Sequence, residues 1–150
     1  MSLNIDVQRA CSLKNIPSDK KFQHWSEAAT KGRTTATELN IRIVEEGEIT
    51  TLNSQYRGKK QSTNVLSFPF DAVTPEPMPI LGDIVICAPL VVREAQEQNK
   101  SIESHWAHLV VHGILHLLGY DHDTDNNAKI METLESEILT KMNYPSPYEN

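Results

Sequence analysis

Three histidines near the carboxyl end of the chain have the spacing of metal ligands. His112 and His116 are four residues apart, and His122 follows six residues later. Residues four apart on a helix differ by about 40° around the axis and about 6 Å along it, so both imidazoles can reach one ion. Gly119 permits a sharp turn, after which His122 can fold back as a third ligand. Three imidazoles leave one position of a tetrahedral Zn²⁺ open, as in catalytic sites that activate water near neutral pH.

The residue that follows the first histidine narrows the class of hydrolase. The spacing from His112 to His122 matches the H-E-x-x-H-x-x-G-x-x-H motif of metzincin peptidases. Those enzymes carry a glutamate as general base where this chain has Gly113. A peptidase mechanism therefore lacks its proton acceptor at this position. The pattern predicts a zinc hydrolase whose metal lies on a zincin-like helix, and it argues against a protease.

Other titratable residues in or near this region have more than one possible role. His108 shares a helix face with His112, but a fourth imidazole ligand would close the site, so packing or support of a ligand is favoured over coordination. Asp121 adjoins His122 and can support that ligand, cap a helix or act as general base, and the first two roles are favoured. Asp83 is expected either to face the site or to cap its own turn.

The surrounding sequence predicts strands and helices mixed in one unit. Alternating apolar residues indicate strands, longer amphipathic stretches indicate helices, and Ser, Pro and Gly mark their ends. The predicted strands are 3–9, 38–44, 64–68 and 81–87, and the predicted helices are 19–31, 46–56, 89–98, 102–118 and 124–142. The strand 64–68 is expected near a sheet edge, because Pro69 follows it directly. We expect one domain over 1–150, α+β in class or α/β with a small sheet, with 143–150 as a loose tail.

Composition and charge are typical of a globular protein and do not identify its partner. Of the 150 residues 39% are apolar, and no apolar run approaches the roughly 20 residues of a membrane span. The first residues show no secretory signal, so Cys11 and Cys87 are expected to be free thiols of a cytoplasmic protein. Residues 1–70 hold ten Lys and Arg against seven Asp and Glu, whereas 71–150 hold four against thirteen. The first half can thus present a basic face despite the net charge of −6.

Three blocks of sequence resemble those of one known family. The stretch from His112 to His122, H-G-I-L-H-L-L-G-Y-D-H, resembles the signature of the YbeY family of metal-dependent endoribonucleases. Two shorter blocks agree with it in order and spacing, Y-R-G-K at 56–59 with T-N-V-L-S-F-P at 63–69, and G-D-I at 82–84. The likeness extends from the second predicted strand through the last helix.

The resemblance implies a fold, a reaction and a metal. The fold is a small, mixed, mostly parallel four-stranded sheet packed with helices. The reaction is cleavage of single-stranded RNA, in 3′-end maturation of small-subunit ribosomal RNA and in ribosome quality control, with that RNA and the small subunit as partners. The metal is one Zn²⁺ per chain, held by His112, His116 and His122.

The resemblance also places an arginine of the family at Arg57, where a planar guanidinium can bind a phosphate oxygen through paired hydrogen bonds. Lys59 and Lys60 would extend the positive track for the RNA backbone. We therefore predict catalytic roles for Arg57, His116 and Asp121, and substrate binding by Arg57, Lys59 and Lys60.

Two other hypotheses stay open on the sequence alone. The chain can be a zinc hydrolase acting on an amide or an ester, with a general base outside the motif. Alternatively, it can be a non-catalytic, ribosome-associated module in which zinc only holds the last two helices together. The sequence does not indicate an oligomeric state.

Overall fold

The computed structural model describes residues 3–58, 63–70 and 79–148 of the chain. The elements in these ranges are β1 (Asn4–Ala10), α1 (Asp19–Thr30), β2 (Glu38–Val44), α2 (Glu46–Arg57), β3 (Val65–Pro69), β4 (Ile80–Cys87), α3 (Ala88–Glu97), α4 (Ile102–Leu117) and α5 (Asp125–Lys141). Each lies within one residue of its predicted bounds. Hydrophobic periodicity was therefore a sufficient guide to the local structure.

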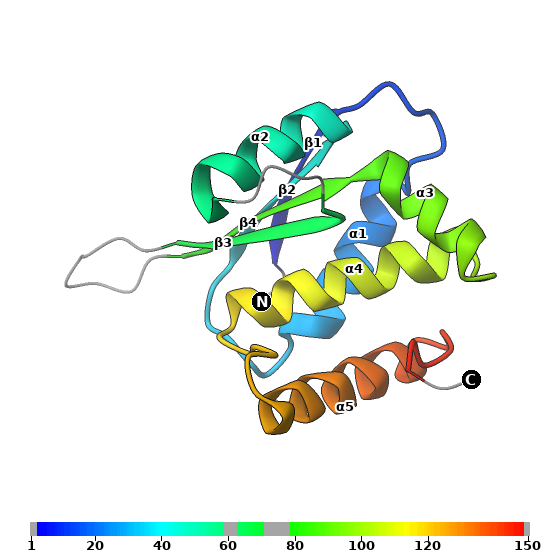
Figure 1. The fold of residues 1–150 in the computed structure, drawn as a ribbon. Helices are drawn as coiled ribbons and strands as arrows, with labels where there is room; N and C mark the ends of the chain where they lie inside the picture. Colours follow the sequence, from blue (N-terminus) through cyan, green and yellow to red (C-terminus); the bar gives the residue numbers. More distant parts are fainter. Residues whose placement is uncertain (1–2, 59–62, 71–78, 149–150) are drawn as a thin grey trace.

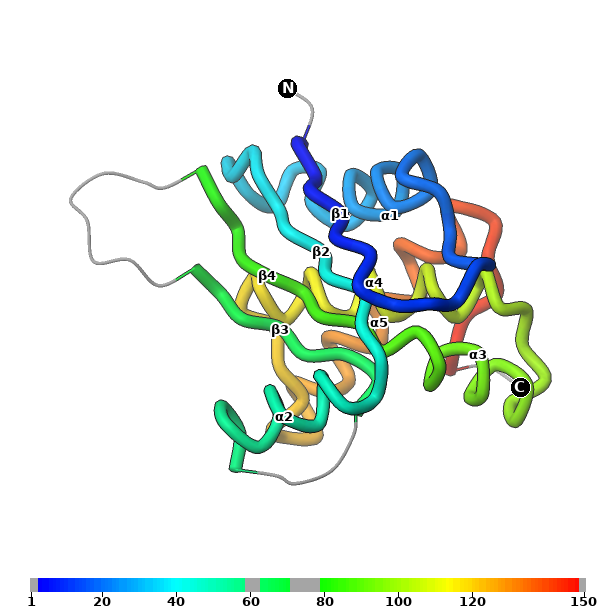
Figure 2. The backbone as a smooth tube through the Cα atoms, turned by 90° about the horizontal axis from the view of Figure 1, so that it is seen from above, coloured from blue at the N-terminus to red at the C-terminus, as the bar shows by residue number. Residues whose placement is uncertain are grey.

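The four strands form one mixed sheet in the order β1-β2-β4-β3 (Figure 2). The β1–β2 and β2–β4 pairs are parallel, and β3 pairs antiparallel with β4 at the sheet edge. The α+β class and the mixed, mostly parallel sheet are thereby confirmed. So is the edge position expected for the strand before Pro69, which cannot donate a ladder hydrogen bond.

Helices cover the two faces of the sheet unequally (Figure 1). On one face, α1 and α4 pack against alternate residues of the central strands, which are Leu39, Ile41, Ile43, Ile84 and Ile86. On the other face, α2 closes a smaller apolar cluster at one end of the sheet. The outermost helix, α5, packs against α4 and not against the sheet. The helix α4 is therefore a buried central element, enclosed by the sheet, by α1 and by α5.

The helix ends carry the capping groups that the backbone needs. Side-chain oxygens of Ser18, Ser101 and Thr124 accept hydrogen bonds from backbone N–H groups in the first turns of α1, α4 and α5. Pro89 occupies the first turn of α3, where its missing N–H costs nothing. Gly58 ends α2 in the left-handed conformation at φ 69°.

Residues 143–148 lie against the helices, where the sequence predicts a loose tail. Nε1 of Trp25 donates to the hydroxyl of Tyr144 (3.0 Å), which in turn donates to Glu103 (2.8 Å). The hydroxyl of Tyr148 donates to Glu135. The prolines of this segment suggested looseness, but two tyrosines supply both apolar contact and hydrogen-bond donors.

Cys11 and Cys87 are both free thiols, as predicted. Among the helices in the described ranges, none is long and apolar enough to cross a bilayer.

The helix α4 lies close against the sheet at Gly113. The hydroxyl of Ser67 in β3 donates to the carbonyl oxygen of Gly113 at 2.9 Å. A Cβ atom at position 113 would lie 3.1 Å from Cγ2 of Ile84 and 3.3 Å from the Ser67 hydroxyl. The sequence was interpreted only as lacking a catalytic glutamate here. The packing shows a further reason for glycine, because a Cβ atom would be crowded against Ile84 and Ser67, which would have to shift.

We expect Gly113→Ala to lower the free energy of unfolding by about 1–3 kcal/mol, because the added methyl group must displace Ile84 or Ser67. Gly47→Ala is the matched control, since an added Cβ in that turn of α2 meets nothing within 4 Å. It should be neutral or stabilise by up to about 1 kcal/mol. Denaturant unfolding measures both, and wild-type stability of Gly113→Ala would contradict this account of the contact.

Candidate metal centre

Three imidazoles meet where α4 ends. The Nε2 atoms of His112 and His116 are 3.1 Å apart, and one ring nitrogen from each of His112, His116 and His122 lies within 4.8 Å of the other two. A zinc ion holds nitrogen ligands at about 2.0–2.1 Å. Small rotations of these side chains therefore bring all three nitrogens onto one ion.

A left-handed turn returns the chain from α4 to the histidines. Gly119 has φ 100°, and the N–H of Tyr120 donates to the carbonyl of Leu115 at 3.0 Å, as in a Schellman motif. Two residues later His122 lies beside the histidines of the helix. The carboxylate of Asp121 accepts from the backbone N–H of His122 at 2.8 Å, so it helps to hold this loop.

The surroundings of His116 favour its neutral form. Burial lowers the pKa of His116 below its usual value, and the neighbouring His112 and His122 lower it further. A neutral imidazole offers the lone pair that a metal ion requires. The donor set, three neutral nitrogens without a thiolate, suits Zn²⁺ or a similar divalent ion.

A buried carboxylate supports this group from α5. The side chain of Glu135 has no exposed surface, and its Oε1 lies 2.6 Å from Nδ1 of His112. Its Oε2 lies 2.9 Å from Nε2 of His108 and also accepts from the Tyr148 hydroxyl. Burial raises the pKa of Glu135, but these three donors outweigh it and bring the pKa down to about 2. The carboxylate is therefore ionised and can only accept, so both imidazoles donate to it.

Sequence reasoning missed Glu135, although a signal was present. The apolar face of α5 includes Met131 and Ile138, and Glu135 lies on the same face, four residues after the first and three before the second. A single carboxylate on an apolar helix face needs buried partners. For His108 the sequence favoured packing or support of a ligand over coordination, and the structure places it on Glu135.

The histidines open into a pocket of about 650 Å³, bounded by α2, β3 and the end of α4. It is lined by Asn53, Arg57, Thr63, Asn64, Val65, Leu66, Ser67, Pro69, His112, His116, Gly119, Tyr120, Asp121 and His122. Arg57 thus shares a cavity with the three imidazoles. One of its N–H groups donates to the carbonyl of Ser67 at 3.3 Å, which orients the guanidinium without neutralising it. Asp121 contributes the one carboxylate among the described lining residues.

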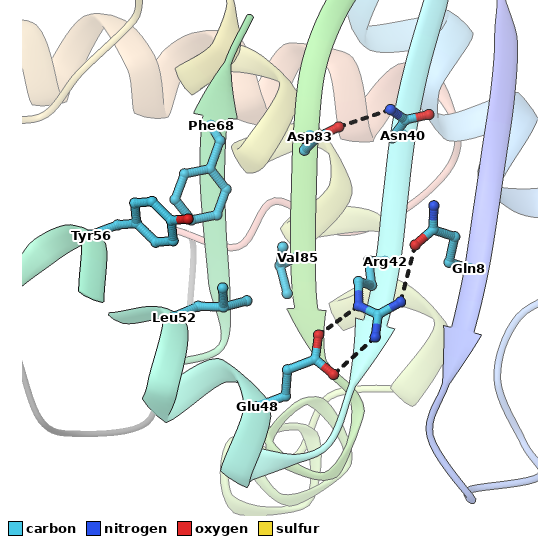
Figure 3. A pocket seen from close by; sticks show the side chains of 9 residues that line it. All are labelled: Gln8, Asn40, Arg42, Glu48, Leu52, Tyr56, Phe68, Asp83 and Val85. Atoms are coloured by element: carbon cyan, nitrogen blue, oxygen red, sulfur yellow. Dashed lines mark hydrogen bonds and ion pairs between the residues drawn. The ribbon is translucent and has the colours of Figure 1, made fainter. Parts of the chain in front are cut away.

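Two other predicted residues, Lys59 and Lys60, lie outside the described residues. Asp83 was expected either to face the site or to cap its own turn, and the structure shows neither arrangement. It points to the opposite face of the sheet, where Asn40 donates to it at 2.9 Å (Figure 3). The pocket of about 460 Å³ on that face contains Arg42 and Glu48, which pair with each other. The residues after Asp83, Ile84–Cys87, are all buried and apolar, so the sequence shows no alternation from which the face of Asp83 could be predicted.

The mixed sheet and the histidine group define a class of small α+β protein with an open, three-imidazole candidate metal centre. The sequence matches the family model described as endoribonuclease YbeY over residues 5–143. It is 51% identical over 149 residues to the endoribonuclease YbeY of Pseudomonas entomophila strain L48, which covers 97% of this chain and 93% of that protein. The chain belongs to the YbeY family.

A solved structure agrees with the fold. A protein of Thermotoga maritima, determined in solution, matches with a TM-score of 0.56 and 26% sequence identity. The match covers 96% of this chain and 99% of that one. The arrangement of strands and helices described above is thus shared along nearly the whole chain.

We expect His116→Ala to lose zinc, because two imidazoles remain where three lie within 4.8 Å of one another in the wild-type chain. His24→Ala is the matched control, since His24 is an exposed residue of α1 and not a member of the group. Elemental analysis after dialysis should find one zinc per chain in the wild type and in His24→Ala, and none in His116→Ala. Wild-type zinc content in His116→Ala would remove this histidine from the site.

Proposed function

We propose that this chain is a metal-dependent endoribonuclease that hydrolyses phosphodiester bonds in single-stranded RNA. The observation that carries the proposal is the pocket in which Arg57 shares a cavity with His112, His116 and His122. Phosphodiester hydrolysis is promoted by a cationic group that binds the phosphate and by a Lewis acid that acts on the phosphate oxygen or the attacking water. This pocket contains candidates for both, and family membership identifies RNA as the substrate class.

The role of Arg57 follows from its position and its chemistry. Its planar, permanently charged guanidinium can donate two parallel hydrogen bonds to a phosphate. The Ser67 carbonyl orients it toward the pocket before substrate arrives. Zinc, the ion that we propose for the three histidines, supplies Lewis acidity to a phosphate oxygen or to an attacking water.

Asp121 is the candidate for handling a proton. It holds the loop through its bond to the His122 backbone, and it is the one described carboxylate that lines the pocket. We propose that it acts first as a support of this loop. If a side chain accepts the proton of the attacking water, Asp121 is the described carboxylate in position to do so.

The biological substrate that we propose is small-subunit ribosomal RNA, cleaved during 3′-end maturation and ribosome quality control. This part of the proposal is supported by the sequence resemblance and not by the pocket itself. Lys59 and Lys60 follow Arg57 in the chain, and we propose that they extend its positive charge along the RNA backbone.

The two alternatives are weaker. Hydrolysis of an amide or an ester, with a base outside the motif, is disfavoured because the chain belongs to a family described as endoribonucleases. A purely structural zinc is also disfavoured, since structural sites are closed by protein ligands, whereas the His122 side chain is 60% exposed. Moreover, Glu135 already joins α5 to His112 of α4, so the two helices do not need a metal to hold them together.

The proposed activity is tested with a single-stranded ribosomal RNA fragment and the same fragment annealed to its complement. Zinc-loaded protein should cut the single strand and spare the duplex, and a chelator or His116→Ala should abolish cleavage. Cleavage that survives both treatments would come from a contaminating nuclease and would contradict the proposal. Absence of cleavage by the zinc-loaded wild type, together with unfolding of His116→Ala, would favour the structural alternative.

Arg57→Ala should reduce RNA cleavage by about 100-fold or more, because it removes a charge-stabilising donor from the reacting phosphate. Its zinc content should stay at the wild-type level, since Arg57 contacts Ser67 and not a histidine. Arg33→Ala removes the same charge from the turn after α1, away from the pocket, and should cleave normally. Loss of zinc in Arg57→Ala, or wild-type cleavage by it, would defeat the assignment.

A further inference from the structure

We propose that Glu135 is a positioning residue that fixes the imidazole of His112 for metal binding. The inference rests on the metal site of the proposed function and adds a residue from a different helix to it. Glu135 touches neither the pocket around Arg57 nor the ring nitrogen of His112 that faces the other histidines. It acts through the opposite nitrogen of the same ring.

The geometry selects one tautomer of His112. Its Nδ1 lies 2.6 Å from a buried carboxylate oxygen of Glu135, so we infer that Nδ1 donates the proton of this hydrogen bond. A ring that donates through Nδ1 leaves its lone pair on Nε2, the atom that lies 3.1 Å from Nε2 of His116. A carboxylate behind a ligating histidine fixes its ring orientation and raises its basicity. Without Glu135, His112 could place its proton on Nε2 and lose its capacity to bind.

The carboxylate of Glu135 is fixed in place by hydrogen bonds to three side chains. Burying an ionised group is costly unless every lone pair finds a donor. Both oxygens of Glu135 are occupied, one by His112 and the other by His108 and the Tyr148 hydroxyl. These donors come from α4 and from the carboxyl-terminal segment, so two separate parts of the chain fix the carboxylate. Packing alone would be served as well by an apolar residue in this face of α5.

The same contacts argue against a second metal ion at this place. Ligand atoms of His108, His112 and Glu135 also lie within 4.8 Å of one another. However, the two imidazole contacts already have hydrogen-bond lengths of 2.6 and 2.9 Å. To bind an ion here, Nδ1 of His112 would have to lose its proton. At the same time, Nε2 of the same ring would have to bind the ion of the three-histidine group. One ring would then have to bridge two cations as an imidazolate.

The first test compares zinc dissociation constants, measured by competition with a chromophoric chelator. Glu135→Gln keeps the shape of the side chain but replaces one acceptor oxygen with a donor group, so affinity should fall about 10–100-fold. Glu94→Gln is the matched control, because Glu94 of α3 lies 2.8 Å from Nε2 of His105, a histidine of α4 outside the three-histidine group. Glu94→Gln should bind zinc as tightly as the wild type.

The second test needs no measurement of activity, and its decisive result comes from the wild type alone. In the metal-free wild type, ¹⁵N shifts of the His112 ring should show the proton on Nδ1, and in Glu135→Gln they should show a mixture of tautomers. A merely structural role of Glu135 would not move this signal. A proton on Nε2 in the wild type would overturn the proposal, even if Glu135→Gln fails to fold.

The outcomes separate this inference from the proposed function. A wild-type chain that binds no zinc overturns both, because the metal site itself is then wrong. A wild type that binds one zinc, with Glu135→Gln binding it equally tightly, overturns the positioning role alone. Two zinc ions per wild-type chain, of which Glu135→Gln keeps one, would overturn it in favour of a second metal site.

Discussion

The contact of α4 with the sheet at Gly113 is the constraint on which the rest of the site depends. The helix lies against Ile84 and donates no side chain there, while its Gly113 carbonyl accepts from Ser67 of the edge strand. Because protein interiors are close-packed, this contact fixes the distance of α4 from the sheet and the rotation of the helix about its own axis. His112 precedes Gly113 and His116 follows within one turn, so their positions beside β3 are set by the same contact. Ser67 also orients Arg57, and it therefore ties both sides of the pocket to one strand.

The group of three histidines is supported by a buried side chain on one side and is open on the other. His112 is held by the buried carboxylate of Glu135 on α5, and this carboxylate is not exposed to solvent. His122, in contrast, lies on an exposed loop that is held by a left-handed turn and by Asp121. A ligand group of this kind offers a fixed nitrogen on the protein side and leaves access for substrate on the other. That division is typical of catalytic metal sites and is consistent with the function that we propose.

Local features of the site could be read from the sequence, whereas tertiary ones could not. The spacing of His112, His116 and Gly119 depends only on helix geometry and on a helix-ending glycine, and the structure brings these residues together as that geometry requires. The apolar face of α5 includes Glu135 and can be read from the sequence, but the partners of this carboxylate, His108 and His112, cannot. For Asp83, local periodicity does not indicate which face of β4 meets α4. The contacts of Tyr144 and Tyr148 could not be predicted either, because their partners Trp25, Glu103 and Glu135 lie on other elements of the chain.

The central claim is an open zinc site of three imidazoles, one of them positioned by a buried carboxylate. A structure determined with zinc bound tests it most directly. The account predicts one ion held by nitrogens of His112, His116 and His122, with a fourth position open toward Arg57 and with Glu135 still bonded to Nδ1 of His112. An ion found on His108, His112 and Glu135, or a fourth protein ligand that closes the shell, would contradict it.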